Sequence, residues 1–353
     1  MLNRDRLSQL RDLMAERQWD LLLLYGHTWR KDFFRCLLNV NFSGPHAIAA
    51  LDRSGEVRAV MSDPWDAELT TECAASADFI QGVTELATRG GVVAIAGMEM
   101  MEARYVQIFS GAVSATFDVE EIRRVKTPRE MQVMRQAADL ADRGYQHFAS
   151  VIETGMAEYE LVAEVEGFLK ANGAEDNFML IASGGTEVTG MKPPTERRFR
   201  PGDSVTTELT PQVDGYWAQI CRTLVLGEPN AQQRESFSIF REAQQAAVDY
   251  LKPGVNISDV ARVQNDVFRK FGYGEYTGPK YTRVRGHGIG LHCDENPYVL
   301  EDVNYTVKEG MTLIAHPNTY LPLSGYMVFG DSLVVTANGC EALNHTERTL
   351  FQK

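Results

Sequence analysis

The sequence lacks any apolar run long enough to span a bilayer, and its first residues carry no signal-peptide pattern. Cysteine is scarce, with 5 residues and no CxxC pair, which argues against structural zinc and is typical of a reducing compartment. No low-complexity segment interrupts the chain. We therefore expect a cytoplasmic protein with no membrane partner.

Positive charge is also in deficit. The chain has 35 Lys and Arg against 48 Asp and Glu, a formal net charge of -13. Such a protein repels nucleic acids and anionic membranes at long range, so we expect neither as a partner. A small cationic or zwitterionic molecule is easier to accommodate.

The 353 residues are many for one hydrophobic core, so we expect two domains. The first, residues 1–125, alternates helical and strand patterns and predicts an α/β domain. A leucine stripe indicates a helix over residues 3–17, and a helical pattern returns over residues 64–74. Strands are predicted at residues 20–25, 47–51, 57–61 and 92–96.

The second domain, residues 126–353, begins with a capping box at residues 127–130, with proline at the first helical position. Two helices followed by strands then occur twice, which indicates an internal duplication. The first block has predicted helices at 128–150 and 156–171, a strand at 177–182 and a hairpin at 202–223. The second has predicted helices at 232–251 and 257–271, followed by the last strands.

Titratable side chains are concentrated in one glycine-rich stretch, residues 285–298, which reads RGHGIGLHCDENPY. Glycines let the backbone approach a ligand closely, so this composition favours a functional site over core packing. The stretch contains four candidate acid/base or ligand residues: His287, His292, Asp294 and Glu295.

Three further segments carry polar residues that we expect at the same site. The first long hairpin of the second domain has Glu208 on one strand and Gln219 on the other. A later predicted strand carries His316, and a predicted hairpin at residues 325–339 holds Asp331. Four segments are therefore expected to converge on one polar cluster.

The motifs together resemble the pita-bread family of creatinase, aminopeptidase P, prolidase and methionine aminopeptidase. They are GHGIGL within residues 285–298, GYxxxxxRT at residues 215–223 and EGM at residues 309–311. The resemblance covers residues 127–341, and the N-terminal third more loosely. It implies an α/β N-terminal domain, an α+β pita-bread domain with a curved antiparallel sheet, and, from the likeness to creatinase, a homodimer.

Metal-dependent members of this family hold two divalent ions with two aspartates, one histidine and two glutamates. By the resemblance, the histidine is kept as His287, while the other positions are Glu208, Gln219, His316 and Gly330. Both bridging carboxylates are therefore replaced, by an amide and by a glycine. Two close dications need anionic bridges, so we expect no dinuclear centre and no metal cofactor.

The replacements are hydrogen-bonding or acid/base residues, which suggests that the site is reused for other chemistry. We expect His287 to do acid/base work with Glu208, His316 and Asp294 as partners. The resemblance to creatinase, a metal-free member, favours hydrolysis of a C–N bond in an amidine, guanidine or amide of a small polar metabolite. Candidate substrate contacts are Gln219, Glu295, His292, Met191, Asp331 and Arg285, the last as a clamp for a substrate carboxylate.

Two alternatives remain open from the residues. Glu208, His287 and His316 are the ligand set of a mononuclear iron or zinc site, as in an oxygenase. A non-catalytic binding protein is the second alternative. The roles of Cys221 and Cys293, as reactive thiols or as small packing residues, also stay open.

Overall fold

The computed structural model describes residues 2–353 and divides into two compact units, Met1–Arg124 and Val125–Lys353. This division lies one residue before the predicted boundary. None of the helices in the described part of the chain has the length and apolarity needed to cross a membrane.

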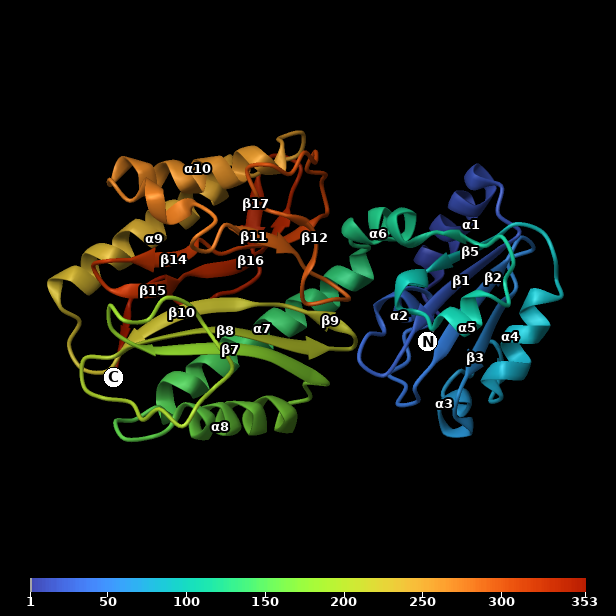
Figure 1. The fold of residues 1–353 in the computed structure, drawn as a ribbon, viewed down its shortest axis with the longest axis horizontal. Helices are drawn as coiled ribbons and strands as arrows, with labels where there is room; N and C mark the ends of the chain where they lie inside the picture. The colour runs from blue at the N-terminus through green and yellow to red at the C-terminus, as the bar shows by residue number, and fades with distance from the viewer. Residues whose placement is uncertain (1) are drawn as a thin grey trace. The chain divides into compact units, whose positions relative to one another are not determined.

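The N-terminal unit is built around a mixed six-stranded sheet in the order β4-β3-β2-β1-β5-β6 (Figure 1). The continuous apolar run of residues 21–26 forms the wholly buried central strand β1, as predicted. The strands are β1 (Leu21–Gly26), β2 (Ala47–Asp52), β3 (Val57–Met61), β4 (Ala74–Ser76), β5 (Val93–Ala96) and β6 (Val113–Ser114). The helices are α1 (Arg4–Arg17), α2 (Asp32–Leu37), α3 (Pro64–Glu68), α4 (Phe79–Ala87), α5 (Ala103–Val106) and α6 (Thr116–Arg124).

The helix predicted over residues 64–74 is too long. Helix α3 ends at Glu68, and Ala74 begins strand β4, which pairs in parallel with β3. Thr70 turns the chain, because its backbone N–H and its hydroxyl both donate to the Ala67 carbonyl. Edge pairing with β3 therefore replaces the last helical turns.

The C-terminal unit places four helices around a ten-stranded sheet, with α7 and α8 on one side of the strands and α9 and α10 on the other (Figure 1). One buried apolar cluster joins α7 and α8 to β8 and β10, and another joins α9 and α10 to β13 and β16. The helices are α7 (Pro128–Val151), α8 (Glu158–Ala171), α9 (Ala231–Tyr250) and α10 (Ile257–Lys270). The strands are β7 (Asp176–Gly184), β8 (Ser204–Val213), β9 (Tyr216–Trp217), β10 (Ile220–Val225), β11 (Gly286–Gly288), β12 (Glu295–Tyr298), β13 (Thr312–Ala315), β16 (Gly330–Val335), β17 (Cys340–Ala342) and β18 (Phe351–Gln352).

The predicted capping box at the start of α7 is confirmed. The Glu130 N–H donates to the Thr127 hydroxyl at 3.3 Å, and the Thr127 N–H donates to the Glu130 carboxylate at 2.9 Å. The second carboxylate oxygen of Glu130 accepts a hydrogen bond from the Tyr216 hydroxyl at 2.8 Å. The cap therefore also ties α7 to β9, beside the hairpin that carries Glu208 and Gln219.

The hairpin predicted at residues 325–339 is wrong. Strand β15 (Gly325–Val328) instead pairs with the preceding β14 (Asn318–Leu321) in a separate two-stranded sheet. The chain then enters the large sheet as β16, between β13 and β10. Gly325 makes the β14–β15 turn possible, because its φ of +83° is left-handed and its backbone packs against the Gly185 carbonyl.

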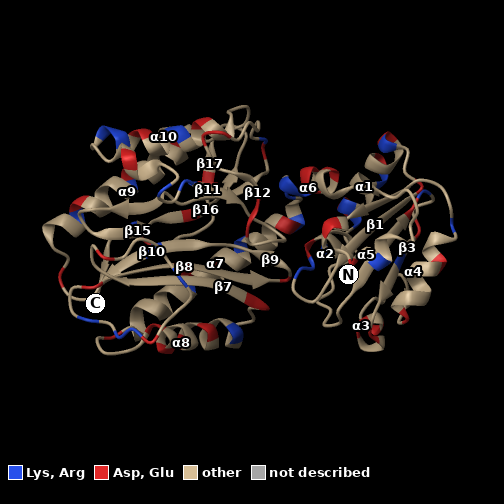
Figure 2. Cartoon of the chain, viewed as in Figure 1, with Lys and Arg blue, Asp and Glu red and all other residues tan. Residues whose placement is uncertain are grey.

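Charged residues lie mainly on the helices and loops, whereas the strands of the ten-stranded sheet are largely uncharged (Figure 2). Asp176 of β7 and Glu341 of β17 are exposed, whereas the other charged residues on those strands, Glu208, Arg222, Glu295 and Asp331, are buried. A charge buried on a sheet needs either a partner or a function. These buried charged residues therefore mark a region of the sheet that is a candidate functional site.

Candidate active site

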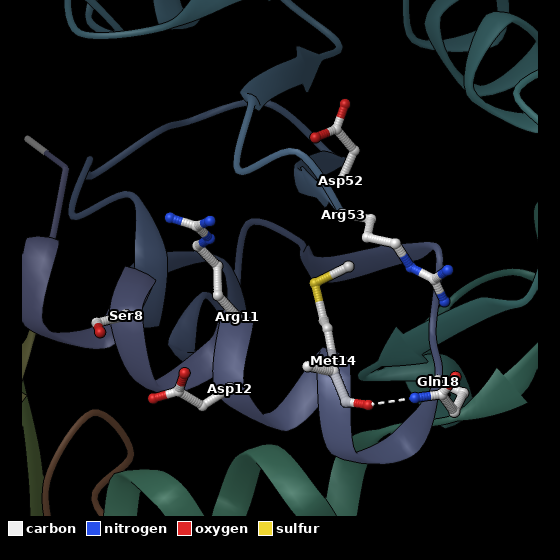
Figure 3. A pocket seen from close by; sticks show the side chains of 8 residues that line it. Ser8, Arg11, Asp12, Met14, Gln18, Asp52 and Arg53 are labelled. Carbon is white, nitrogen blue, oxygen red and sulfur yellow. Dashed lines mark hydrogen bonds between the residues drawn. The ribbon is translucent and has the colours of Figure 1, made fainter.

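Two cavities in the structure differ in what lines them. The cavity in the N-terminal unit, about 540 Å³, lies beside α1 and between side chains that include Arg11 and Arg53 (Figure 3). Both arginines are exposed, Arg53 pairs with Asp20, and Asp52 pairs with Arg89. This cavity is a solvated surface hollow of paired charges, and none of the predicted site residues lies there.

The second cavity, about 490 Å³, lies in the C-terminal unit. It brings together side chains from β8, from the loop before β10, from β11 and the loop after it, and from the segment after β13. Seven of the ten predicted site residues line it: Met191, Glu208, Gln219, His287, His292, Asp294 and His316.

Glu208 lies in the middle of β8, opposite Leu180 of β7 and Cys221 of β10. Its side chain is buried, and within residues 2–353 its carboxylate has no hydrogen-bond partner. Burial, with the nearby charge of Asp294, raises the pKa of Glu208 to about 7. This carboxyl group therefore changes its charge near neutral pH.

His287 lies in β11, where glycines on both sides are required by packing. A Cβ on Gly286 would collide with the Ile314 carbonyl, and one on Gly288 would lie 2.7 Å from the Asn296 carbonyl oxygen. The imidazole Nδ1 is 2.8 Å from the Gly288 carbonyl oxygen and 3.5 Å from an Asp294 carboxylate oxygen.

A carbonyl oxygen can only accept, so Nδ1 of His287 carries the proton and the neutral ring keeps its lone pair on Nε2. Burial lowers the pKa of His287, with the Asp294 carboxylate acting in the opposite direction. The imidazole is thus a neutral base, with a carboxylate placed to stabilise its protonated form.

His316 follows β13 directly and is buried beside His287, with the ring centroids 5.2 Å apart in an edge-on arrangement. Burial lowers the pKa of His316 well below its ordinary value, and the neighbouring His287 lowers it further. Neither ring nitrogen has a hydrogen-bond partner. A neutral, buried and unpaired imidazole in a cavity wall is a group that a ligand can satisfy.

Gln219 and Met191 complete the predicted lining. The backbone of Gln219 is fixed by Ser332, whose hydroxyl accepts from the Gln219 N–H at 2.9 Å and donates to its carbonyl at 3.0 Å. The Gln219 side-chain amide donates to the Cys221 sulfur at 3.3 Å. Met191 packs against a small apolar cluster that includes Tyr326, so this wall is apolar.

Three predicted substrate contacts do not line the cavity, because their side chains bind other protein groups. Glu295 pairs with Lys126 at 3.3 Å and accepts from the His292 N–H at 3.0 Å. Asp331 pairs with Arg222 at 2.7 Å and with Arg348 at 3.0 Å.

Arg285, the predicted carboxylate clamp, is fully buried. Its Nε donates to the Asn265 side chain at 2.6 Å, and its Nη1 donates to the Thr282 and Asn318 carbonyls at 2.8 and 3.0 Å. The guanidinium therefore holds loops behind the cavity wall instead of facing a ligand. Its Nη2 has no hydrogen-bond partner in the described part of the chain. A solvated arginine and a buried one look alike in the sequence, so the burial of Arg285 could not be predicted from it.

Sequence reasoning missed several cavity residues. Tyr298, Thr282, Asn318 and Tyr326 bring polar groups, and Phe178 and Leu180 bring apolar surface. Asn318 had a usable signal, because it lies two residues after His316. For the cysteines, Cys293 lines the cavity, whereas the Cys221 thiol is buried behind it with a pKa that burial raises well above its ordinary value.

A model of metallopeptidase family M24 matches residues 132–337, more than half of the chain. The chain belongs to metallopeptidase family M24. It is 32% identical over 235 residues to the Xaa-Pro dipeptidase of Pyrococcus furiosus, and 31% identical over 235 residues to that of Lactobacillus helveticus. These matches span 66% of this chain and 66% and 63% of the two relatives, just under two thirds of their lengths.

Solved structures of M24 relatives extend the likeness to both units. The X-Pro aminopeptidase of Thermotoga maritima superposes with a TM-score of 0.88 at 23% identity, covering 98% of this chain and 99% of that one. The prolidase of Pyrococcus furiosus gives a TM-score of 0.81 at 25% identity, covering 96% and 99%. The predicted pita-bread fold, with an N-terminal α/β unit and a curved antiparallel sheet, is confirmed.

The donor set of this M24 chain does not fit the metal centre that the family name implies. The two positions that the family resemblance assigns to bridging carboxylates carry the neutral Gln219 and Gly330, and a Cβ on Gly330 would lie 2.5 Å from both the Ala315 carbonyl oxygen and the His316 Cβ. The strands leave no space there for a carboxylate. Across residues 2–353, no three His, Cys, Asp or Glu side chains are placed to hold one metal ion.

Proposed function

We propose that this M24 member hydrolyses a C–N bond in an amidine, guanidine or amide of a small polar metabolite, without the dinuclear metal centre. One observation carries the proposal. The cavity presents a neutral imidazole, His287, whose Nδ1 is fixed by the Gly288 carbonyl and whose Nε2 is free to accept a proton. In the proposed reaction this imidazole activates water, the role that metal ions have elsewhere.

The proposed reaction starts with a water molecule held between His287 and the substrate carbon. Nε2 takes a proton from the water as its oxygen forms a bond to that carbon, and Asp294, 3.5 Å from Nδ1, stabilises the imidazolium. The imidazolium then returns the proton to the leaving nitrogen as the C–N bond breaks. The products are a carbonyl compound and an amine, and no oxidant or reductant is consumed.

Glu208 binds the substrate in this scheme. A positively charged N–H group stabilises the ionised carboxylate, which lowers its pKa from about 7 when substrate binds. His316, neutral and unpaired, offers a further hydrogen-bonding group to the same substrate.

A second candidate is Xaa-Pro dipeptide cleavage, which the 32% identity to a named Xaa-Pro dipeptidase favours. Against it, the cavity lining within residues 2–353 includes no Lys or Arg to pair with the carboxylate of a dipeptide. It does contain the two acidic residues Glu208 and Asp294. The charge of the site therefore favours a cationic substrate over an anionic end group.

The test is a substrate panel of amidines, guanidines, amides and Xaa-Pro dipeptides, measured with EDTA and with added Mn²⁺, Zn²⁺, Co²⁺ or Fe²⁺. We expect turnover of an amidine, guanidine or amide in EDTA, and its loss in the variant His287→Asn. Metal-dependent cleavage of Xaa-Pro dipeptides alone would overturn the proposal. One bound metal per chain that is lost in His316→Ala would favour the mononuclear enzyme, and no turnover of any compound would favour a binding protein.

A further inference from the structure

Three buried residues that line the site cavity carry polar groups without protein hydrogen-bond partners. Glu208 has no hydrogen-bond partner for its carboxylate within residues 2–353, and both ring nitrogens of His316 are unpaired. The third group is the side-chain oxygen of Asn318, a residue that is only 5% exposed. All three residues line the same cavity. A neutral imidazole has one acceptor nitrogen and one N–H donor, so each of the three residues offers at least one acceptor. Unpaired buried acceptors are costly, so their presence in one cavity indicates a ligand that donates hydrogen bonds.

Asn318 is rigidly placed for this role. It is the first residue of β14 and pairs with Val328 of β15. Its backbone carbonyl accepts a hydrogen bond from Nη1 of the buried Arg285 at 3.0 Å. The side-chain oxygen is thus held by a paired strand and a buried guanidinium rather than by a mobile loop.

The cavity also lacks positive charge. Two buried cations, Lys126 and Arg285, lie outside the cavity lining. Lys126 pairs with Glu295, and Arg285 donates to Asn265 and to backbone carbonyls while its Nη2 has no hydrogen-bond partner among residues 2–353. The acidic residues in the cavity lining are Glu208 and Asp294. A carboxylate ligand would be repelled, and a cation with several N–H groups would be attracted.

The aromatic side chains in the lining favour a flat cation. Phe178, Tyr298 and Tyr326 contribute aromatic surface to the cavity, and such surfaces attract planar cations. A planar group with N–H donors on different edges can reach acceptors on separate strands, whereas an ammonium group is compact and strongly hydrated. A neutral amide has fewer donors and no charge for Glu208.

We propose that this cavity binds an amidinium or guanidinium group, and that the Asn318 side-chain oxygen is a specificity-determining acceptor for one of its N–H groups. This inference rests on the proposed function, because it names the substrate class of the same site. Glu208 neutralises the cation, and His316 lies beside the same group. Asn318 discriminates N–H from N-alkyl or oxygen at that position.

The test measures binding of three probes by calorimetry, in buffer with EDTA. Acetamidinium is the expected ligand, acetamide is its neutral isostere, and hexamethylguanidinium is a planar cation without N–H groups. We expect acetamidinium to bind at least about tenfold more tightly than either of the others, which corresponds to about 1.4 kcal/mol.

Two variants at position 318 and one control variant test the role of Asn318. Asn318→Leu keeps the size of the side chain and removes the acceptor, so acetamidinium should bind about tenfold more weakly. Gln264→Met is the matched control, because Gln264 also has a buried and unpaired side-chain oxygen but lies outside the cavity lining. It should leave the affinity unchanged. Asn318→Asp, which adds negative charge, should bind acetamidinium at least as tightly as the unaltered protein, and it remains informative if Asn318→Leu does not fold.

The inference is overturned if acetamide binds as tightly as acetamidinium, if Asn318→Leu keeps full affinity, or if Asn318→Asp weakens binding. These measurements involve no turnover, so they are separate from the test of hydrolysis. Acetamidinium binding that depends on Asn318 supports the inference even if no C–N bond is cleaved. Hydrolysis of neutral amides alone, without acetamidinium binding, overturns it and leaves the proposed hydrolysis intact.

Discussion

Replacing Glu208 by Gln should stabilise the protein at neutral and alkaline pH. A largely buried carboxylate with no protein hydrogen-bond partner destabilises the folded state when it ionises. Glutamine has almost the same shape and never ionises. The variant should therefore be more stable and less able to bind a cation.

The size and the pH range follow from the pKa. The ordinary value is 4.5 and the folded value is about 7. Below pH 4.5 both states are protonated and the substitution changes little. Between pH 4.5 and 7 the unfolded chain ionises first, so the folded state of the unaltered protein loses stability as pH rises. Above pH 7 the loss is constant, at about 1.4 kcal/mol for each pH unit of that interval, or about 3 kcal/mol.

Differential scanning calorimetry at pH 4.5, 6 and 8 measures this effect, with EDTA present. About 3 kcal/mol corresponds to a rise of roughly 6 to 12 °C in the melting temperature of a unit of this size at pH 8, and to almost none at pH 4.5. Glu196→Gln is a matched control at an exposed position, and it should show no such pH-dependent gain. A difference between Glu208→Gln and the unaltered protein that does not grow with pH would refute the reasoning, because the carboxylate would then be solvated or paired.

Four further predictions test other parts of the site. His287→Asn removes the titrating ring but keeps a polar side chain, so we expect folded protein with turnover at least about 100-fold lower. Near-full turnover in this variant would mean that another residue transfers the proton. Gly330→Ala places a methyl group 2.5 Å from the Ala315 carbonyl oxygen, so it should lower the free energy of unfolding, measured with denaturant, by about 1–3 kcal/mol. The control Gly339→Ala, where no atom lies within 4 Å of the added methyl group, should leave it unchanged. Elemental analysis should find no stoichiometric zinc, iron, manganese or cobalt, and close to one metal per chain would contradict this. We also propose a homodimer, and a mass measurement at micromolar concentration that finds only monomer would remove it.

Local features of the fold were predictable because local rules decide them. The capping box at Thr127 fixes where α7 begins through hydrogen bonds between residues three apart. The apolar run predicted as a strand at residues 20–25 has the length of a buried strand and is short for a helix, and it forms β1 one residue later. The 325–339 hairpin failed because the choice of partner is not local. Strand β15 pairs with the preceding strand β14, and not with the strand that follows it.

The sequence predicted those site residues whose positions are fixed by the family motifs. His287, Glu208 and His316 come together because the family motifs fix their strands. Arg285 and Asp331 were misjudged because burial and pairing of a charge depend on residues far away in the sequence, such as Asn265 and Arg222. Asn318 was missed for the same reason, since a buried acceptor without a partner can be recognised only when all of its neighbours in the fold are known.

The close approach of Gly330 to Ala315 and His316 has an implication for evolution and engineering. The obstacle to a carboxylate at position 330 is a backbone oxygen and a Cβ, so changing the residue at position 316 alone does not remove it. Strands β13 and β16 are paired there, through Ala315 and Asp331, and would have to move apart. A library that varies only side chains at positions 219, 316 and 330 should therefore yield few metal-binding revertants. Under the proposed metal-free reaction, regaining a bridging carboxylate at position 330 requires a backbone change in β13 or β16, and side-chain changes alone are not enough.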